Sequence, residues 1–444
     1  MQDAPIEIDA LTPVSSPAPF LKKNVLIFPA GAENALEIHA SLRHSVHFKI
    51  YGGSSVEDHA RFAYENYIGG MPRLSDPDFL SGLNDLIRRY DIELIFPTHD
   101  TVALFLAEHR NEVDARVVTA DARTALICRE KRRTFALFQD EDFCPELFAD
   151  AQAVQAFPVF VKPSVGEGGK GAQLVKDKEA LAASTAGNPD LLICEWLPGE
   201  EFTVDCFTDR RGQLLFVGPR SRDRVRMGIS FASRTAPLTN EVSAIAHRIN
   251  GRLGFRGLWF FQLKRAVDGR FKLLEISTRL AGTMSVYRQL GVNFSLLSAF
   301  DALDYDVSIL INDLPLMVDR CLLSRYRIDY AYDTVFIDYD DTIVHEGQVN
   351  ELVMRFLYQC ANRGVRLVLV TRHAGDLGAH MRAHRIAAEL FDEIRHLQPG
   401  ELKSAHIRGP RAVFIDNHFP ERLDVKRNCG IPVFDVDAVE GLLR

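Results

Sequence analysis

The feature that most constrains the fold is a regular alternation of short apolar runs and amphipathic stretches near the start of the chain. The run NVLIFPAG at 24–31 precedes a helical stretch, and HFKIYGGS at 47–54 follows it. A third run, IELIFPTHD at 92–100, comes after a second helical stretch. Short apolar strands that alternate with helices indicate βαβ units and a parallel sheet. We therefore predict a parallel α/β domain over residues 23–125.

The chain has 444 residues, more than one hydrophobic core usually organises. A helix predicted over 122–139 leads into alternating strand patterns, which are typical of an α+β region with antiparallel sheet. From residue 333 four strand-like runs again alternate with helices. We predict a multidomain chain of mixed α/β and α+β class, with a flexible arm over 1–22 and domains over 23–125, 126–325 and 330–444.

Composition excludes several classes of function. Lys and Arg number 52 against 60 Asp and Glu, so the net charge of −8 provides no basic field for nucleic acid or anionic lipid. No stretch reaches the roughly 18 apolar residues that cross a bilayer, and the N-terminus lacks the pattern of a signal peptide. The seven cysteines lack the spacing of a zinc site. We expect a soluble cytoplasmic protein without nucleic-acid or membrane partners, with a homo-oligomer possible.

A glycine-rich segment follows a strand that carries a lysine. In VFVKPSVGEGGKGAQLV, Lys162 ends the apolar run, and Gly166, Gly168, Gly169 and Gly171 follow. Closely spaced glycines let backbone N–H groups approach phosphate oxygens, and the lysine supplies positive charge. The spacing matches neither a Walker nor a Rossmann motif. The segment predicts a polyphosphate site, with a glycine-rich hairpin turn as the alternative.

Two further patterns carry polar groups on strands. Gln262 and Glu275 punctuate apolar strands, and adjacent strands could bring their oxygens onto one face, where they would suit Mg²⁺ bound to phosphates. Two solvated strand-edge residues are the alternative. The stretch PRSRDRVRMG places arginines at alternate positions, which face one side of a strand and could bind a carboxylate or phosphate. A solvated basic loop is equally compatible with these four residues, Arg220, Arg222, Arg224 and Arg226.

The order of these pieces resembles the ATP-grasp superfamily, particularly the branch of biotin carboxylase and carbamoyl-phosphate synthase. The resemblance covers roughly residues 24–325, including the CREK helix, the VFVKPS strand with its glycines, CEWLPGEEFTVD and LLEISTR. It implies an ATP-grasp fold in which Lys131 and Lys162 contact the ATP phosphates and Gly166 to Gly171 close over them. It further implies that the adenine lies against Glu195, Trp196 and Leu197, and the ribose against Glu200 or Glu201.

The same resemblance implies Gln262 and Glu275 as Mg²⁺ ligands and Arg279 as the arginine that contacts the transferring phosphate. The family commonly has Asn two residues after that glutamate, where this chain has Ser277. Because serine offers a shorter neutral oxygen, we expect a second metal to be bound there more weakly or through water. The implied activity is an ATP-dependent ligase: the γ-phosphoryl group goes to a small-molecule carboxylate, and an amine or other nucleophile attacks the acyl phosphate.

The motif TVFIDYDDTIV brings an apolar strand directly to Asp338, followed by Asp340 and Thr342. A carboxylate at the carboxyl end of a strand lies where parallel sheets bind ligands. Asp338 could attack phosphorus, Asp340 could protonate the leaving group and later activate water, and Mg²⁺ would hold Asp338 beside the phosphate. An acidic turn is the alternative.

Three later residues complete a pattern: Thr371 and Lys403 as phosphate contacts, and Asp416, which with Asp338 and Asp340 would hold Mg²⁺. These motifs resemble the haloacid dehalogenase (HAD) superfamily over residues 330–444. The resemblance implies a Rossmann-like domain with phosphatase activity on a related phosphorylated metabolite. The short intervals between motifs leave little room for a large cap domain. Asn417 stands where many members have a second acid, and Glu421 is near enough to replace it. We expect the flanking histidines to be exposed, namely His345, His373 and His418.

The leading hypothesis is therefore a bifunctional enzyme, an ATP-grasp carboxylate–amine ligase fused to an Mg²⁺-dependent phosphatase. The two activities could act in sequence if ligation used a phosphorylated building block and the phosphatase removed the phosphate. One alternative is a nucleotide-binding regulatory protein whose grasp site is inactive. Another is a ligase whose C-terminal domain is only structural.

Overall fold

The computed structural model describes residues 21–166 and 168–444, so that residues 1–20 of the predicted arm lie outside the described part. The chain divides into two compact units, a first unit that ends at Leu322 and a C-terminal unit that begins at Leu323. Within the described residues, every helix is too short or too polar to cross a membrane.

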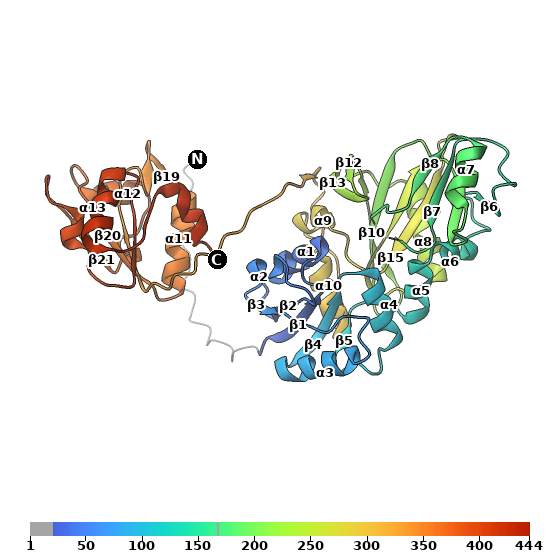
Figure 1. The fold of residues 1–444 in the computed structure, drawn as a ribbon, viewed down its shortest axis with the longest axis horizontal. Helices are drawn as coiled ribbons and strands as arrows, with labels where there is room; N and C mark the ends of the chain where they lie inside the picture. Colours follow the sequence, from blue (N-terminus) through green and yellow to red (C-terminus); the bar gives the residue numbers. More distant parts are fainter. Residues whose placement is uncertain (1–20, 167) are drawn as a thin grey trace, which may run out of the picture. The chain divides into compact units, whose positions relative to one another are not determined.

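A five-stranded parallel sheet opens the first unit, in the order β3-β2-β1-β4-β5. Its apolar side chains alternate between two faces, one packed on α1 and α10 and the other on α3 and α4 (Figure 1). The parallel α/β region predicted from the sequence is therefore confirmed. Its elements are β1 (Lys23–Phe28), α1 (Glu33–Leu42), β2 (Phe48–Gly53), α2 (Ala60–Ala63), β3 (Asn66–Ile68), α3 (Phe79–Tyr90), β4 (Ile92–Pro97), α4 (Asp100–Glu108) and β5 (Arg116–Val117).

Two antiparallel sheets follow, in the orders β6-β9-β7-β8 and β11-β10-β14-β15, with a small third sheet β12-β13-β16. Helix α8 packs on the second sheet around the buried Trp259. The elements are α5 (Ala122–Arg129), α6 (Lys131–Leu137), β6 (Leu147–Phe148), β7 (Val159–Pro163), β8 (Gln173–Val175), α7 (Lys178–Thr185), β9 (Leu191–Glu195), β10 (Glu201–Thr208), β11 (Leu214–Ser221), β12 (Arg224–Arg226), β13 (Ile229–Arg234), α8 (Asn240–Arg252), β14 (Gly257–Arg265), β15 (Phe271–Ser277), α9 (Ser285–Gln289), α10 (Phe294–Ala302) and β16 (Met317–Asp319).

The single helix predicted over 122–139 is wrong, because the structure has two helices there. Helix α5 ends and α6 begins on either side of Glu130, whose backbone is extended. The amide of Lys131 donates to the carbonyl of Ser164 at 2.9 Å, just after β7, instead of continuing the helical ladder. The break therefore anchors Lys131 beside the start of the glycine-rich segment.

The expectation that four alternating arginines face one side of one strand is also wrong. Strand β11 ends and β12 begins on either side of Arg222, so the stretch belongs to two sheets. Arg220 is buried and pairs with Asp205, whereas Arg224 and Arg226 are exposed. The segment therefore supplies buried guanidinium groups at one end and a solvated turn at the other.

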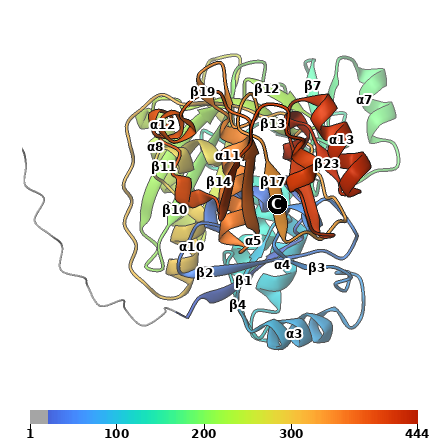
Figure 2. The ribbon, with the colours of Figure 1, turned by 90° about the vertical axis from the view of Figure 1, so that its left-hand side faces the viewer.

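The C-terminal unit contains a second five-stranded parallel sheet, in the order β21-β20-β17-β22-β23. Helices α11 and α13 cover opposite faces of this sheet (Figure 2). A two-stranded hairpin stands between β17 and α11. The elements are β17 (Thr334–Ile337), β18 (Val344–His345), β19 (Gln348–Val349), α11 (Glu351–Asn362), β20 (Arg366–Thr371), α12 (Leu377–Ala383), η1 (Ala388–Leu390), β21 (Glu393–His396), η2 (Lys403–His406), β22 (Ala412–Ile415), α13 (Phe419–Cys429), β23 (Val433–Phe434) and η3 (Val436–Leu442).

Candidate functional site

Two cavities in the first unit adjoin each other, because Lys131, Gln262 and Glu275 line both. We call the larger one, of about 290 Å³, the lysine cavity, and the smaller one, of about 130 Å³, the arginine cavity. The lysine cavity is further lined by Lys162, Gly166, Gly168, Gly169, Glu195, Trp196, Leu197 and Glu201. The lining of the arginine cavity includes Asp100, Arg129, Thr203, Arg220, Arg222, Ser277, Arg279 and Arg320.

The two predicted phosphate lysines come from different elements and meet at the lysine cavity. Lys162 lies on β7, is 8% exposed, and donates through Nζ to the carbonyl of Leu274 at 3.1 Å. Burial lowers the pKa of this ammonium group. Lys131 places its Nζ 3.3 Å from the carbonyl oxygen of Gly166 and 3.6 Å from Glu275 Oε2. The two ammonium groups therefore provide concentrated positive charge where a polyphosphate could bind.

The glycine segment forms the turn between β7 and β8 and packs against a second turn. Gly168 and Gly169 have positive φ angles of 59° and 68°, and Gly228, between β12 and β13, has 73°. A Cβ atom on Gly228 would come within 2.3 Å of the carbonyl carbon of Gly168. The two turns therefore approach each other closely at the rim of both cavities. A side chain at Gly228 would clash with the backbone of Gly168, and the positive φ angles favour glycine at these positions.

The residues expected around a nucleotide base and ribose are largely brought to the lysine cavity. Trp196 is 37% exposed and Leu197 is buried, and both follow β9 at the cavity wall. Glu195 accepts a hydrogen bond through Oε1 from the amide of Glu146 at 2.9 Å. Glu201 lines the cavity and pairs with Arg222 at 2.7 Å. Two residues of the prediction, Gly171 and Glu200, belong to the described part but not to the lining of this cavity.

Gln262 and Glu275 lie directly opposite each other on β14 and β15, so their side chains project from the same face of the sheet. Amide and carboxylate oxygens suit Mg²⁺, which usually takes a few protein oxygens and completes its shell with phosphates and water. Among residues 21–166 and 168–444, no group of three or more His, Cys, Asp or Glu side chains is arranged to hold a metal. The donors present therefore fit an ion that phosphate oxygens would also hold.

Asp100 was not predicted as a site residue from the sequence. Its carboxylate binds two residues that were predicted, Ser277 and Arg279. It opens α4, after β4, and accepts hydrogen bonds from Ser277 Oγ at 2.7 Å and Arg279 Nε at 3.0 Å. Burial alone would raise the pKa of Asp100, but Arg279 and Ser277 outweigh it and hold the pKa below its ordinary value. Ser277, predicted as a weak metal ligand, thus donates its hydroxyl proton to Asp100. The available signal was a carboxylate after the third predicted strand of a parallel sheet.

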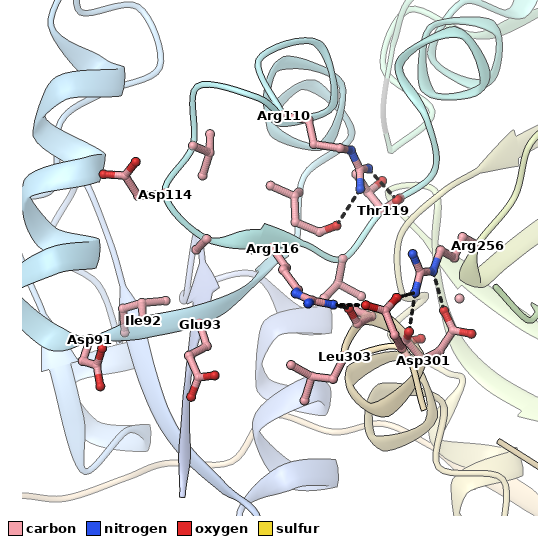
Figure 3. A pocket seen from close by; sticks show the side chains of 18 residues that line it. Asp91, Ile92, Glu93, Arg110, Asp114, Arg116, Thr119, Arg256, Asp301 and Leu303 are labelled. Atoms are coloured by element: carbon pink, nitrogen blue, oxygen red, sulfur yellow. Dashed lines mark hydrogen bonds and ion pairs between the residues drawn. The ribbon is translucent and has the colours of Figure 1, made fainter. Parts of the chain in front are cut away.

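A third cavity, of about 730 Å³ and so larger than the other two, lies near the start of β4 and beside β5 (Figure 3). Four of its charged side chains pair with one another: Arg116 lies 2.6 Å from Asp304, and Arg256 lies 2.7 Å from Asp301. Arg110 donates to backbone carbonyls, including that of Thr119 at 2.9 Å. Size alone therefore does not make this cavity the chemical centre, because its polar groups are used to hold the surrounding elements together.

In the C-terminal unit the predicted residues meet where parallel strands end. Asp338 and Asp416 follow Ile337 and Ile415, which are register partners on β17 and β22. Lys403 Nζ lies 2.7 Å from Asp338 Oδ1 and 2.7 Å from Asp416 Oδ2. The sheet therefore gathers two carboxylates and one ammonium group at its carboxyl edge, and the buried Thr371 ends the neighbouring strand β20.

Burial dominates the electrostatics of this cluster. It raises the pKa of Asp338 to about 6, against the opposing effect of Lys403, and it raises the pKa of Asp416 as well. Two buried carboxylates share one ammonium group, so a further cation would stabilise their ionised forms. The donor set therefore fits a divalent cation such as Mg²⁺ in the presence of a phosphate.

Asp340 lies at the more exposed rim of this cluster, and its role as a metal ligand stays a prediction. Its side chain is 48% exposed, and His373 Nδ1 lies 2.8 Å from its Oδ1. His373 itself is 10% exposed, so the expectation of an exposed histidine is wrong at this position, whereas His345 is 61% exposed. Glu421, expected to replace a missing acid, is engaged by Arg372. The position of Asp340 suits proton transfer at the rim of the cluster.

Comparison with known proteins places the first unit. A model described as "ATP-grasp in the biosynthetic pathway with Ter operon" matches residues 187–313, and one described as "Carbamoyl-phosphate synthase L chain, ATP binding domain" matches residues 143–215. No curated protein matches the chain.

Similar solved structures share the fold at low identity. Biotin carboxylase from Campylobacter jejuni has a TM-score of 0.53 and 16% identity, over 66% of this chain and 74% of that one. L-amino acid ligase from Bacillus licheniformis has 0.52 and 18%, over 64% and 74%. N5-carboxyaminoimidazole synthetase from Staphylococcus aureus has 0.54 and 13%, over 67% and 82%. Residues 143–313 therefore carry an ATP-grasp domain, related in fold to biotin carboxylase and to the large chain of carbamoyl-phosphate synthase.

Proposed function

We propose that the first unit is an ATP-dependent ligase. The carboxylate of a small acid attacks the γ-phosphorus of ATP and displaces ADP, and an amine then attacks the carbonyl carbon of the acyl phosphate and displaces inorganic phosphate. The observation that carries this proposal is the convergence of Lys131, Lys162, Gln262 and Glu275 on two adjoining cavities. The larger of the two is proposed to take the nucleotide, and the other, which shares Gln262 and Glu275 with it, is proposed to take the acid. Structures of the same fold include a protein titled an L-amino acid ligase, which supports this reaction class.

In this proposal the lysine cavity binds ATP. Trp196 and Leu197 flank the adenine together with Glu195, and the position of Glu201 in the cavity wall favours it over Glu200 for the ribose. Mg²⁺ would be held by Gln262 and Glu275 and would supply neutralisation of phosphate charge. Lys131 and Lys162 neutralise the remaining charge and hold the triphosphate in place, which is most of what phosphoryl transfer requires of a protein.

Arg279 is proposed to contact the transferring phosphoryl group at the boundary with the arginine cavity. Its guanidinium is held by Asp100 through Nε, which fixes the direction of the remaining N–H donors. A fixed cation pointed at the developing charge stabilises the transition state without reorganisation. Asp100 is thus a positioning residue for Arg279.

The test is release of ADP by the full chain with Mg²⁺·ATP against a panel of carboxylic acids, each paired with amino acids as amines. The proposal expects release that depends on both partners and that falls strongly in Glu275→Gln. Exchange of Lys178, an exposed residue of α7, for Met serves as a matched control that leaves release unchanged. ATP binding without ADP release for every pair would favour the alternative of a nucleotide-binding regulatory protein.

A second function is favoured by the cluster at Lys403. We propose that the C-terminal unit is an Mg²⁺-dependent phosphatase of the HAD type. Asp338 attacks phosphorus and displaces the alcohol of the ester, which Asp340 protonates; water activated by Asp340 then hydrolyses the aspartyl phosphate and releases inorganic phosphate. The support is the 2.7 Å contacts of Lys403 with both Asp338 and Asp416 at the carboxyl edge of a parallel sheet. This proposal rests on the geometry of that unit. Hydrolysis of p-nitrophenyl phosphate that requires Mg²⁺ and is lost in Asp338→Asn would support it, and its absence in the wild type would leave this unit a structural role.

A further inference from the structure

Four polar atoms in the wall of the arginine cavity are fully buried and have no hydrogen-bond partner among the described residues. Two of them, Arg222 Nε and Arg320 Nη1, still lie in ion pairs, each 2.7 Å from Glu201 and Glu33 respectively. The other two, Thr203 Oγ1 and Arg220 Nη1, have neither kind of partner among these residues. Buried polar atoms in folded proteins are nearly always paired, because leaving them unpaired costs stability. Two such atoms in the wall of one cavity therefore indicate a ligand that forms hydrogen bonds with them.

The two atoms belong to neighbouring residues in a row that crosses the sheet. Arg220 on β11 is the register partner of Thr203 on β10, and Thr203 is the partner of Gln262 on β14. Gln262 in turn is the partner of Glu275 on β15. Directly opposite side chains share one face of an antiparallel sheet, so the row runs from the proposed Mg²⁺ ligands to the unpaired atoms.

The spacing of the strands also gives the distance of these two residues from Gln262. Neighbouring strands lie about 4.8 Å apart, so Thr203 and Arg220 are roughly 5 to 10 Å from Gln262 across the sheet. That separation is comparable to the length of a small acid with polar groups at both ends. A molecule whose carboxylate reacts near Gln262 and Glu275 would therefore place its far end at Thr203 and Arg220.

The chemistry of the far end follows from the donors around it. Arg220 presents N–H groups that can only donate, and a threonine hydroxyl can also donate. Arg222, Arg279 and Arg320 line the same cavity. These three arginines form ion pairs with Glu201, Asp100 and Glu33, respectively. The groups that still lack a partner among the described residues are Thr203 Oγ1 and Arg220 Nη1. The missing partner is an acceptor with negative charge.

A purely structural role for Arg220 explains only part of its geometry. Its Nε and Nη2 donate to Asp205 at 2.7 and 3.1 Å, which accounts for two of its three nitrogens. The third nitrogen is left over, and so is the hydroxyl of Thr203. The nucleotide does not account for them either, because neither residue lines the lysine cavity.

We propose that Thr203 and Arg220 form a subsite for a second anionic group on the acid substrate. The acid of the proposed ligase then carries two anionic groups, the carboxylate that reacts and a carboxylate or phosphate at its far end. This inference rests on the proposed function for its substrate, and it goes further by naming the substrate class.

The decisive variant is Thr203→Val, which has nearly the same shape and removes only the hydroxyl. Because that hydroxyl has no partner among residues 21–166 and 168–444, the thermal unfolding midpoint of the ligand-free chain stays the same or rises. The KM for a dianionic acid rises about tenfold, as expected for a lost hydrogen bond to a charged group, while the KM for ATP is unchanged. Thr185→Val on α7, whose hydroxyl donates to a backbone carbonyl outside both cavities, is the matched control for the kinetic constants.

Arg220 is tested more cautiously, because its removal leaves Asp205 buried without a partner. The double variant Asp205→Asn with Arg220→Gln removes both charges and keeps groups that can hydrogen-bond. It is expected to lose the preference for dianionic acids while still binding Mg²⁺·ATP. A folded double variant that keeps the full preference would overturn the assignment of Arg220.

The probes are matched pairs: glutarate against butyrate, and O-phospho-L-serine against L-serine. We measure ADP release and, in parallel, the rise of the unfolding midpoint caused by each probe and by inorganic phosphate in the full chain. A preference for glutarate identifies the far group as a carboxylate, and a preference for O-phospho-L-serine identifies it as a phosphate. Either preference must weaken in Thr203→Val.

The outcomes separate the subsite from the ligase. ADP release with butyrate and serine as efficient as with their dianionic partners would overturn the subsite and leave the ligase standing. Binding of a dianionic probe that depends on Thr203, without ADP release, would support the subsite and contradict the ligase. Equal binding of every probe by wild type and Thr203→Val, or no binding of any probe, would overturn the subsite.

Discussion

The two units each gather charged groups for which we propose phosphate chemistry, but they do so in different ways. In the C-terminal unit the groups follow the ends of parallel strands, and Lys403 contacts Asp338 and Asp416 at 2.7 Å each. In the first unit they come from the middle of antiparallel strands, from a turn, from the start of α6 and from the start of α4. A parallel sheet thus concentrates its chemistry at one edge, whereas an antiparallel sheet spreads it along a row.

The comparison predicts that the compact cluster is the more sensitive to a single substitution. Asp338→Asn replaces the proposed nucleophile by a neutral amide of the same size, which cannot attack phosphorus. We expect hydrolysis of p-nitrophenyl phosphate to fall by about 10³-fold or more. ADP release by the first unit, measured on the same preparation, is expected to stay at the wild-type level. Parallel loss of both activities would contradict the assignment of separate sites.

The larger site of the first unit is expected to lose less from one change, because several cations share the phosphate charge. Lys162→Met keeps an unbranched apolar side chain and removes the buried ammonium group, whose Nζ lies 4.8 Å from the centroid of the Phe135 ring. We expect ADP release to fall by about 10²- to 10³-fold, as for removal of one preorganised charge donor. Lys178→Met is the control. An unfolding midpoint that stays high while activity is lost would show that the charge serves binding, since a buried ammonium group costs stability in the absence of its ligand.

The contrast also explains how much could be predicted from the sequence. The parallel sheets and the residues at their strand ends, such as Asp338 and Asp416, follow from local motifs, because the end of an apolar run is visible in the sequence. Gln262 and Glu275 could be named as a pair from the strand pattern only beside the alternative of two solvated edge residues, since their pairing depends on register between strands. Thr203 was missed for the same reason. Nothing local distinguishes it from any other threonine on a half-buried strand.

The ends of helices were also predicted wrongly, because they too depend on tertiary contacts. The helix expected over 122–139 breaks at Glu130 because the amide of Lys131 binds the carbonyl of Ser164, a residue remote in sequence. No propensity of the residues at 129–131 requires that break. The finer division of the first unit at residue 125 stays a prediction.

Asp100 follows the parallel sheet of the first unit but contacts residues of the site on the antiparallel sheet, so its substitution tests whether the parallel sheet contributes to that site. Asp100→Asn keeps one acceptor for Ser277 or Arg279 but removes the charge that orients both. We expect kcat to fall by about 10- to 100-fold, in the range seen when a residue that orients a functional group is changed. The KM for ATP should change little, because Asp100 lines the arginine cavity and not the lysine cavity. A large rise in that KM would instead assign Asp100 to nucleotide binding.

The smallest expected effect concerns the two turns that meet at the rim. Gly228→Ala introduces a Cβ 2.3 Å from the backbone of Gly168, and the φ of 73° adds strain of about 1–2 kcal/mol. Gly269→Ala is the matched control, because its φ is 83° but a Cβ there meets open space. Both variants should lose similar stability from strain alone. Only Gly228→Ala should displace the glycine segment, so the KM for ATP is expected to rise by about tenfold or less. Equal KM values in the two variants would mean that the turn moves freely enough to absorb the clash. The glycine segment would then adapt its conformation when it binds phosphate. In that case the site of the first unit would differ from the cluster at Lys403 in rigidity as well as in the arrangement of its charged groups.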